Sequence, residues 1–166
     1  MNYEKAASYW EEKDAASVRM SRDALQAEMQ KFIEKHTTCA LATAYGDFVR
    51  CTPIEYSFKN GMFWMLSEGG LKFHALKHNK NVCLAIYDPY SGFANLAGMQ
   101  VTGTAKVVEP GTKEYSEILE FKKISADNLN KLNHEIHLIC VAPVRIDFLW
   151  SGFKKMDCDV RQFLTF

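Results

Sequence analysis

The sequence has no excess of charge of either sign, because 20 Lys and Arg residues balance 20 Asp and Glu residues. It also lacks the basic stripe that a domain binding DNA or RNA normally shows. No window of about 18 apolar residues occurs, so we expect no membrane-spanning helix. The first residues, MNYEKAASYWEEK, are charged and contain no apolar core, so we expect no signal peptide. These absences argue against nucleic-acid binding and a membrane span, and they favour a cytoplasmic protein.

The chain also lacks a CxxC pair among its five cysteines, which are Cys39, Cys51, Cys83, Cys140 and Cys158. Most of them lie inside apolar, strand-like runs. An odd number of scattered cysteines favours buried, reduced thiols over a disulfide framework. The alternative is a redox pair between Cys39 and Cys51, whose predicted strands are adjacent.

The composition predicts one folded domain over residues 1–166, because 48% of the residues are hydrophobic and 13% are aromatic. There is no internal repeat, low-complexity run or linker. We expect N-terminal helices in 1–36, a barrel in 37–150 and a tail in 151–166, where 152–166 receive no element. The aromatic residues of the first helix are interpreted as ordinary packing residues.

Alternating apolar patterns and turn signals predict the elements. The hairpin signal Asn60-Gly61 is the strongest of them. The predicted strands are Cys39–Ala44, Phe48–Phe58, Met62–Ser67, Val82–Tyr87, Gly98–Glu109, Ile136–Val141 and Val144–Trp150, the last two separated by Pro143. The predicted helices are Tyr3–Asp14, one that follows Ser21, Leu71–Asn79, Glu114–Lys122 and Ala126–Leu132. Six or seven strands with flanking helices indicate an α+β domain built around a small antiparallel barrel.

Two segments carry groups suited to an anion. Arg50 and Thr52 lie two residues apart and therefore share a strand face, and Pro53 places this strand at an edge or bulge. A guanidinium beside a hydroxyl can bind phosphate, although a surface strand with an arginine is an equal alternative.

The second segment is Ser67-Glu68-Gly69-Gly70-Leu71-Lys72, where two glycines allow close backbone approach and a helix begins. A lysine in the first helical turn opposes the helix dipole unless an anion neutralises it. The segment is neither GxGxxG nor a Walker loop, so by itself it is weak evidence for a phosphate site. Together with Arg50 it becomes stronger evidence.

The runs RCTPIEY, MFWMLSEGGLKF, NVCLAIYD, MQVTGTA and PVRIDFLW, in this order, resemble the pyridoxamine 5′-phosphate oxidase-like FMN-binding split-barrel superfamily over about residues 36–155. The resemblance implies a six- to seven-stranded antiparallel split β-barrel. It also implies a homodimer that holds FMN at the subunit interface, and an unidentified small-molecule substrate.

The resemblance also assigns the site. Arg50 and Lys72 would bind the FMN phosphate, with Ser67 close to it. Further FMN-binding residues on the same basis are Cys51, Thr52, Pro53, Leu66, Gln100 and Trp150, the last two from the opposite subunit. No catalytic acid or base is singled out.

Three departures separate the chain from the biosynthetic oxidase. Glu55 stands where that enzyme has a lysine for the substrate phosphate, and Phe73 replaces a second phosphate cation. The segment 151–157 replaces an arginine–histidine cluster. These departures favour the flavoprotein branch that includes nitroimidazole-reductase-like members, and an FMN-dependent oxidoreductase of that kind is our first hypothesis.

Two alternatives remain open from the sequence. One is a flavin-binding carrier or sensor without turnover, and the other is a heme-handling split barrel. The pairs His74 and His78, and His134 and His137, lack an evident third ligand, so we interpret them as surface or packing residues and predict no metal site.

Overall fold

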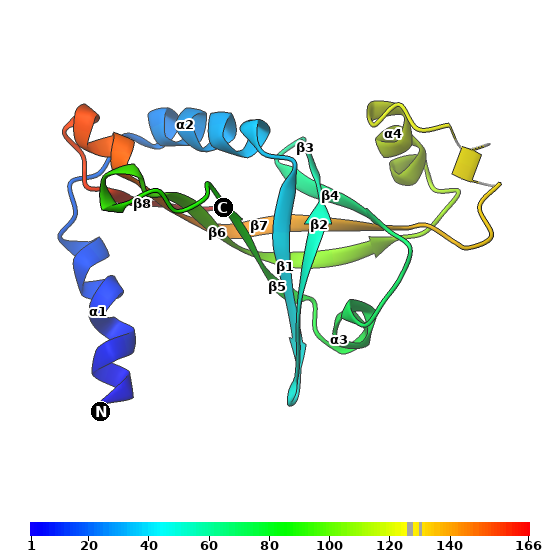
Figure 1. The fold of residues 1–166 in the computed structure, drawn as a ribbon, viewed down its shortest axis with the longest axis horizontal. Coiled ribbons are helices and arrows are strands. Elements are labelled where there is room, and N and C mark those ends of the chain that lie inside the picture. Colours follow the sequence, from blue (N-terminus) through cyan, green and yellow to red (C-terminus); the bar gives the residue numbers. More distant parts are fainter. Residues whose placement is uncertain (126–127, 130) are drawn as a thin grey trace.

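The chain forms one curled antiparallel sheet with helices at its ends and along one side (Figure 1). The computed structural model describes residues 1–125, 128–129 and 131–166. The strands are β1 (Thr38–Tyr45), β2 (Phe48–Glu55), β3 (Ser57–Lys59), β4 (Met62–Ser67), β5 (Asn81–Tyr87), β6 (Ala97–Val108), β7 (His137–Trp150) and β8 (Arg161–Thr165). The helices are α1 (Tyr3–Ala15), α2 (Arg22–Lys35), α3 (Lys72–His78) and α4 (Lys113–Phe121), with short 3-10 helices η1 (Phe93–Asn95) and η2 (Ser151–Met156).

The strand order is β2-β1-β5-β6-β7-β4-β3, and β8 pairs with β7. All strand pairs in this sheet are antiparallel, which confirms the predicted α+β class and the antiparallel barrel. The hairpin at Asn60-Gly61 is also confirmed, because both residues have positive φ (54° and 75°) between β3 and β4.

The prediction of one strand over Phe48–Phe58 is wrong. This stretch is divided between β2 and β3, which lie at opposite edges of the sheet. Tyr56 stands at the division: its N–H donates to the carbonyl of Thr37 (2.8 Å), and its hydroxyl donates to the carbonyl of Ile33 (2.7 Å). The buried tyrosine therefore fixes the corner at which the chain leaves one edge for the other.

The predicted break at Pro143 is also wrong, since β7 continues through it. The register with β6 shifts at this point, so that Thr102 pairs with Arg145 while Gly103 pairs with Pro143. A bulge accommodates a residue that has no N–H to donate. A Cβ on Gly103 would lie only 2.7 Å from the carbonyl oxygen of Ala142, so the close approach requires glycine.

The tail also has regular structure that the sequence did not predict. Strand β8 adds to β7, and η2 connects them. The side chain of Gln162 is fully buried, accepts a hydrogen bond from the N–H of Met20 (3.1 Å) and donates to the carbonyl of Val18 (3.1 Å). The tail therefore fastens the segment between α1 and α2 to the sheet.

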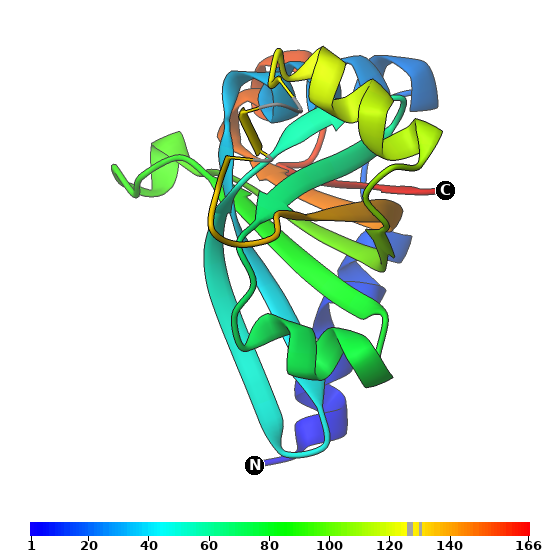
Figure 2. The ribbon, with the colours of Figure 1, turned by 90° about the vertical axis from the view of Figure 1, so that its right-hand side faces the viewer.

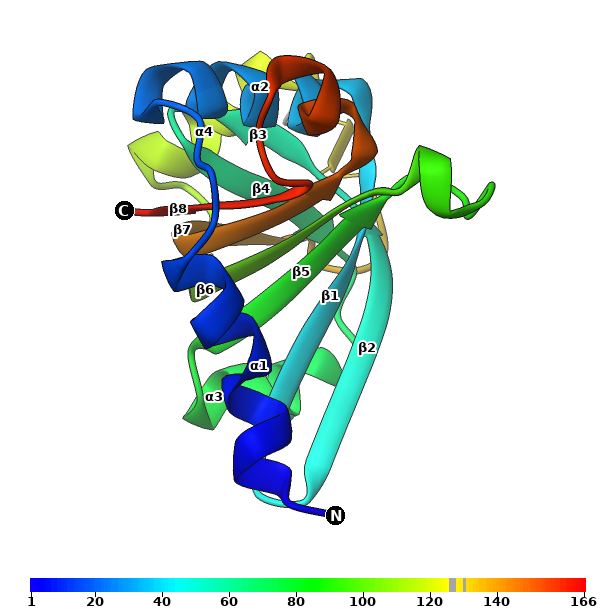
Figure 3. The same ribbon diagram turned by 90° about the vertical axis from the view of Figure 1, so that its left-hand side faces the viewer.

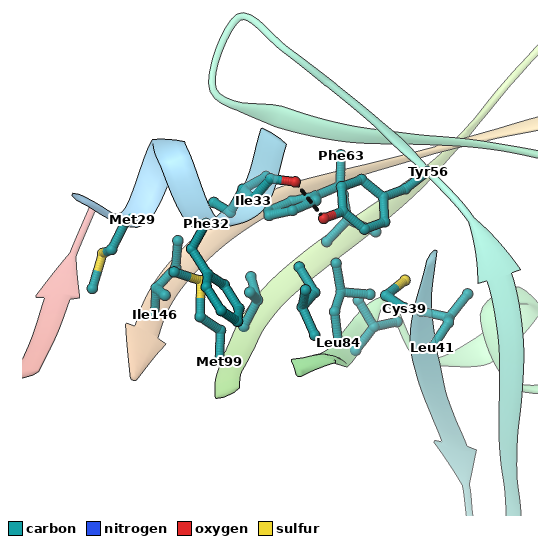
Figure 4. Close-up of a cluster of buried hydrophobic side chains, with 14 of the residues drawn as sticks. Met29, Phe32, Ile33, Cys39, Leu41, Tyr56, Phe63, Leu84, Met99 and Ile146 are labelled. Carbon is teal, nitrogen blue, oxygen red and sulfur yellow. Dashed lines mark hydrogen bonds between the residues drawn. The ribbon is translucent and has the colours of Figure 1, made fainter. Parts of the chain in front are cut away.

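The main core lies between α2 and the concave side of the sheet (Figure 4). The predicted stripe of α2 is confirmed, because Leu25, Met29, Phe32 and Ile33 are all buried. A second, smaller cluster lies between α4 and the strands β4, β6 and β7. Within the described residues no helix buries side chains against the opposite face of the β1–β5–β6 region, because α1, which lies on that side, has no buried residue.

Helix α1 departs from the expected packing. None of its residues is buried, and Trp10 remains 47% exposed. The helix projects beside the sheet (Figures 1 and 3). The predicted helical piece at 126–132 includes residues 126, 127 and 130, which lie outside the described part. Each helix that the structure describes is too short or too polar to span a lipid bilayer.

Candidate phosphate site at the edge of the sheet

Strand β2 forms an edge of the sheet, and its side chains alternate between the two faces. Arg50 lies opposite Thr43, and Thr52 lies opposite Leu41. Because Thr43 and Leu41 are buried, Arg50 and Thr52 lie on the concave side, as their spacing predicts. Cys51 and Pro53 lie on the outer face, so one strand presents site residues to both sides.

Lys72 opens α3 and is the most unusual charged residue of this region, since it is only 6% exposed. Its ammonium donates to the carbonyl of Gly69 and lies 5.3 Å from the ring centre of Phe73. Burial lowers the pKa of Lys72, and the nearby charge of Arg50 lowers it further. Within the described residues, neither cation has a carboxylate partner within 4 Å.

The loop before α3 is held in an extended glycine conformation. Gly69 and Gly70 have φ values of 127° and 102°, which side chains rarely adopt. The buried Ser67 hydroxyl donates to the carbonyl of Gly69 (3.0 Å) and accepts from its N–H (3.2 Å). A Cβ on Gly70 would lie 3.5 Å from Nζ of Lys72, an ordinary contact distance, so the φ of 102° and not the ammonium is what favours glycine there.

One polar atom near this region has no partner among the residues that the structure describes. It is the hydroxyl of Thr43, which is 2% exposed and belongs to the cross-strand neighbour of Arg50. Sequence reasoning missed Thr43, although its place in the alternating strand would have put it opposite Arg50. An arginine, a buried lysine and a free hydroxyl suit an anion with several oxygens.

The remaining predicted site residues are more widely separated. Gln100 is exposed on the outer face in the same cross-strand row as Pro53, with Ala40 and Ala85 between them. Leu66 instead packs toward the cluster beneath α4. A single chain therefore brings Arg50, Ser67 and Lys72 to one region and places Gln100 across the outer face.

Trp150 lies at the end of β7, away from the pair of cations. Its ring stacks on Phe148 with the planes 3° apart and meets Phe153 edge to face. A Cβ on Gly152 would lie 2.3 Å from the indole, so this glycine is needed beneath the ring. The half-buried indole borders a small hollow shared with Phe32 and Lys35.

The cysteines follow the prediction only in part. Cys39 and Cys140 are buried, but Cys51 is exposed on the outer face. Burial raises the pKa of Cys39 to about 12, and the neighbouring Cys51 adds to the shift. Cys39 lies opposite Ile54 on the core side, so a pair with Cys51 is excluded by their opposite directions in the sheet. The cysteines of the chain are free.

The curled antiparallel sheet with its flanking helices defines a split-barrel protein. The family model for pyridoxamine 5′-phosphate oxidase matches residues 25–149, and the chain belongs to this family. No curated protein matches the chain.

Solved structures with this fold come from several bacteria. A putative pyridoxamine 5′-phosphate oxidase of Listeria innocua is 19% identical, with a TM-score of 0.59. The alignment covers 75% of this chain and 98% of that chain. An FAD-binding protein of Mesorhizobium loti is 17% identical, with a TM-score of 0.56 and coverages of 78% and 93%. HutZ, the heme storage protein of Vibrio cholerae, is 16% identical, with a TM-score of 0.60 and coverages of 72% and 89%. At these identities the likeness concerns the fold.

Proposed function

We propose that the protein binds FMN and acts as an oxidoreductase on a small molecule. The observation that carries the proposal is the buried ammonium of Lys72 beside the charge of Arg50, without a carboxylate partner among the described residues. Two like charges held together at a partly buried position are unfavourable unless an anion joins them. The phosphate of a flavin nucleotide supplies that anion, and membership of the family supports a flavin.

In this proposal Arg50 and Lys72 hold the phosphate, and Ser67 fixes the Gly69 carbonyl that orients the ammonium. Cys51, Thr52 and Pro53 line the flavin ring, because an edge strand has backbone groups available to a ligand. The main chain at Leu66 adjoins the same cofactor. Bound FMN would supply one- or two-electron transfer, while the protein sets access to the ring.

We further propose that the functional unit is a homodimer with FMN at the interface, in the cytoplasm. Gln100 and Trp150 would then complete the site from the second subunit. The separation of Trp150 from Lys72 within one chain supports this division. Light scattering coupled to gel filtration tests it, since the account expects twice the mass of one chain and a single-chain mass would contradict it.

We propose that the substrate makes no phosphate contact at Glu55. Glu55 accepts two hydrogen bonds from the ammonium of Lys122 (2.8 and 2.9 Å). A carboxylate at this position repels a phosphate. We therefore propose a small acceptor without phosphate, such as a nitro compound or quinone.

The test is the absorption spectrum of the purified protein. Flavin bands that appear in solution after denaturation, together with oxidation of NADH or NADPH by nitro compounds or quinones, would support the proposal. Bound FMN without any turnover would instead support a carrier or sensor. Heme bands without flavin would contradict the proposal and favour a heme-handling function, as in the heme storage protein HutZ of Vibrio cholerae.

A further inference from the structure

A pocket of about 490 Å³ lies between α1 and the outer face of β5, β6 and β7. We call it the α1 pocket, and define it by Trp10, Tyr87, Leu96, Gln100, Leu149 and Arg161. Its volume is within the range of small-molecule sites, which is roughly 300–1,000 Å³. Residues of the loop between β5 and β6 line another side of the pocket. This loop protrudes from the sheet (Figures 2 and 3).

The helix that closes this pocket is held by charges and not by apolar packing. Asp14 forms ion pairs with Arg145 (2.8 Å) and with Arg161 (3.3 Å). Within the described residues, these are the only ion pairs between α1 and the rest of the chain. Trp10 lies over the guanidinium of Arg161, with 4.8 Å between that group and the ring centre. Because no residue of α1 is buried, the indole is positioned at the pocket without serving the core.

The charged side chains at the pocket decide the kind of ligand. Asp147 pairs with both Arg145 (2.6 Å) and Arg161 (2.7 Å). Burial tends to raise the pKa of Asp147, but the hydrogen bonds from the two arginines outweigh it and the pKa is lowered. Among the described residues the pocket lining carries two carboxylates, Asp88 and Asp147, and one guanidinium, Arg161. This guanidinium is already ion-paired with Asp14 and Asp147, so the lining disfavours an anionic ligand. Its aromatic and aliphatic walls suit a neutral, planar ring system.

The α1 pocket continues toward the residues proposed for the flavin. A neighbouring hollow of about 390 Å³ is lined by Pro53, Ala40, Ala85 and Tyr87, and the two hollows share Ala85 and Tyr87. Pro53, Ala40, Ala85 and Gln100 lie in one cross-strand row. Along this row only alanines lie between Pro53 and Gln100, and the exposed Tyr87 borders both hollows.

We propose that the α1 pocket binds the acceptor substrate, a neutral planar aromatic molecule, and that Trp10 is a specificity-determining wall. The inference rests on the proposed function, because it places the acceptor next to a flavin. Helix α1 thereby contributes to the site although it contributes nothing to the core.

The experiment measures binding of 5-nitroindole to the flavin-loaded protein by equilibrium dialysis, with 5-nitroindole-2-carboxylate as its anionic counterpart. Trp10→Ala should weaken binding of the neutral compound by about tenfold or more, the loss expected when an aromatic contact is removed. Tyr3→Ala is the matched control, since Tyr3 lies on the same helix and is 76% exposed. The anionic compound should bind at least tenfold more weakly to the unaltered protein.

Equal binding to the unaltered protein and to Trp10→Ala would overturn the proposal, as would an equal loss in Tyr3→Ala or a preference for the anion. The flavin content of each sample is measured in parallel. A protein that contains no flavin overturns the proposed function, whereas the comparison of the two variants still decides whether Trp10 forms the wall of a ligand site.

Discussion

Gly152 lies beneath the indole of Trp150 so closely that a Cβ at Gly152 would be 2.3 Å from the ring. The ring is also stacked against Phe148 and bordered by Phe153, so it has little freedom to move away. A tryptophan assigned to the cofactor site is thus positioned from three sides by its own chain.

Gly152→Ala should therefore destabilise the protein by roughly 1–3 kcal/mol, the usual cost of overpacking. Urea unfolding measures the change. Trp150→Ala provides the control background, because the added methyl group no longer meets an indole there and Gly152→Ala should have little further effect. An equal loss in both backgrounds would show that contact with Trp150 is not the cause.

If Lys72 binds the FMN phosphate, its lowered pKa should make FMN binding sensitive to alkaline pH. Burial and the charge of Arg50 both disfavour the ammonium, so Lys72 loses its proton at a lower pH than an ordinary lysine. FMN affinity should be fully present below that pKa, and should fall as the pH rises through it, because only the ammonium attracts phosphate. Without ligand the sign is reversed, since deprotonation removes an unfavourable charge and stabilises the fold.

FMN dissociation constants measured from pH 7 to 10 check this expectation. Lys72→Arg is the control, because a guanidinium keeps its charge throughout this range and its affinity should change less. A parallel decline in the two proteins would assign the pH dependence to another group.

Asp14 should decide whether α1 stays on the sheet. Asp14→Asn removes the charge that pairs with Arg145 and Arg161, at a side chain only 10% exposed. We expect α1 to detach from the sheet about tenfold more often. The unfolding midpoint of the rest of the protein should change little, because α1 has no buried residue. Limited proteolysis around residues 16–20 measures the opening. Glu11→Gln, at an exposed carboxylate of the same helix, should leave the cleavage rate unchanged.

The sequence predicted most of the elements because local patterns determine them. Asn60-Gly61 requires positive φ, and the apolar stripe of α2 has the helical period, so both predictions are confirmed. The errors have a different origin. A proline interrupts a strand only where a backbone N–H is needed for pairing. At Pro143 the bulge opposite Gly103 removes that need, and Gly103 is 40 residues away in the chain.

The tail and α1 could not be predicted for a related reason. Strand β8 exists because β7 offers it an edge, and Gln162 is buried because the main chain at Val18 and Met20 meets it. The network of Asp14 with Arg145 and Arg161 joins residues from both ends of the sequence. No local pattern marks such contacts, whereas Arg50 and Thr52 could be placed on one face by their spacing alone.

The most direct test of the central claim compares FMN with riboflavin, which has the same ring but no phosphate. If Arg50 and Lys72 bind the phosphate, Lys72→Met and Arg50→Ala should each weaken FMN binding by about tenfold or more, in keeping with the loss of a charge-assisted hydrogen bond worth about 1.5–3 kcal/mol. Riboflavin affinity should stay unchanged in both variants. Equal losses for FMN and riboflavin, or no loss for FMN, would contradict the account.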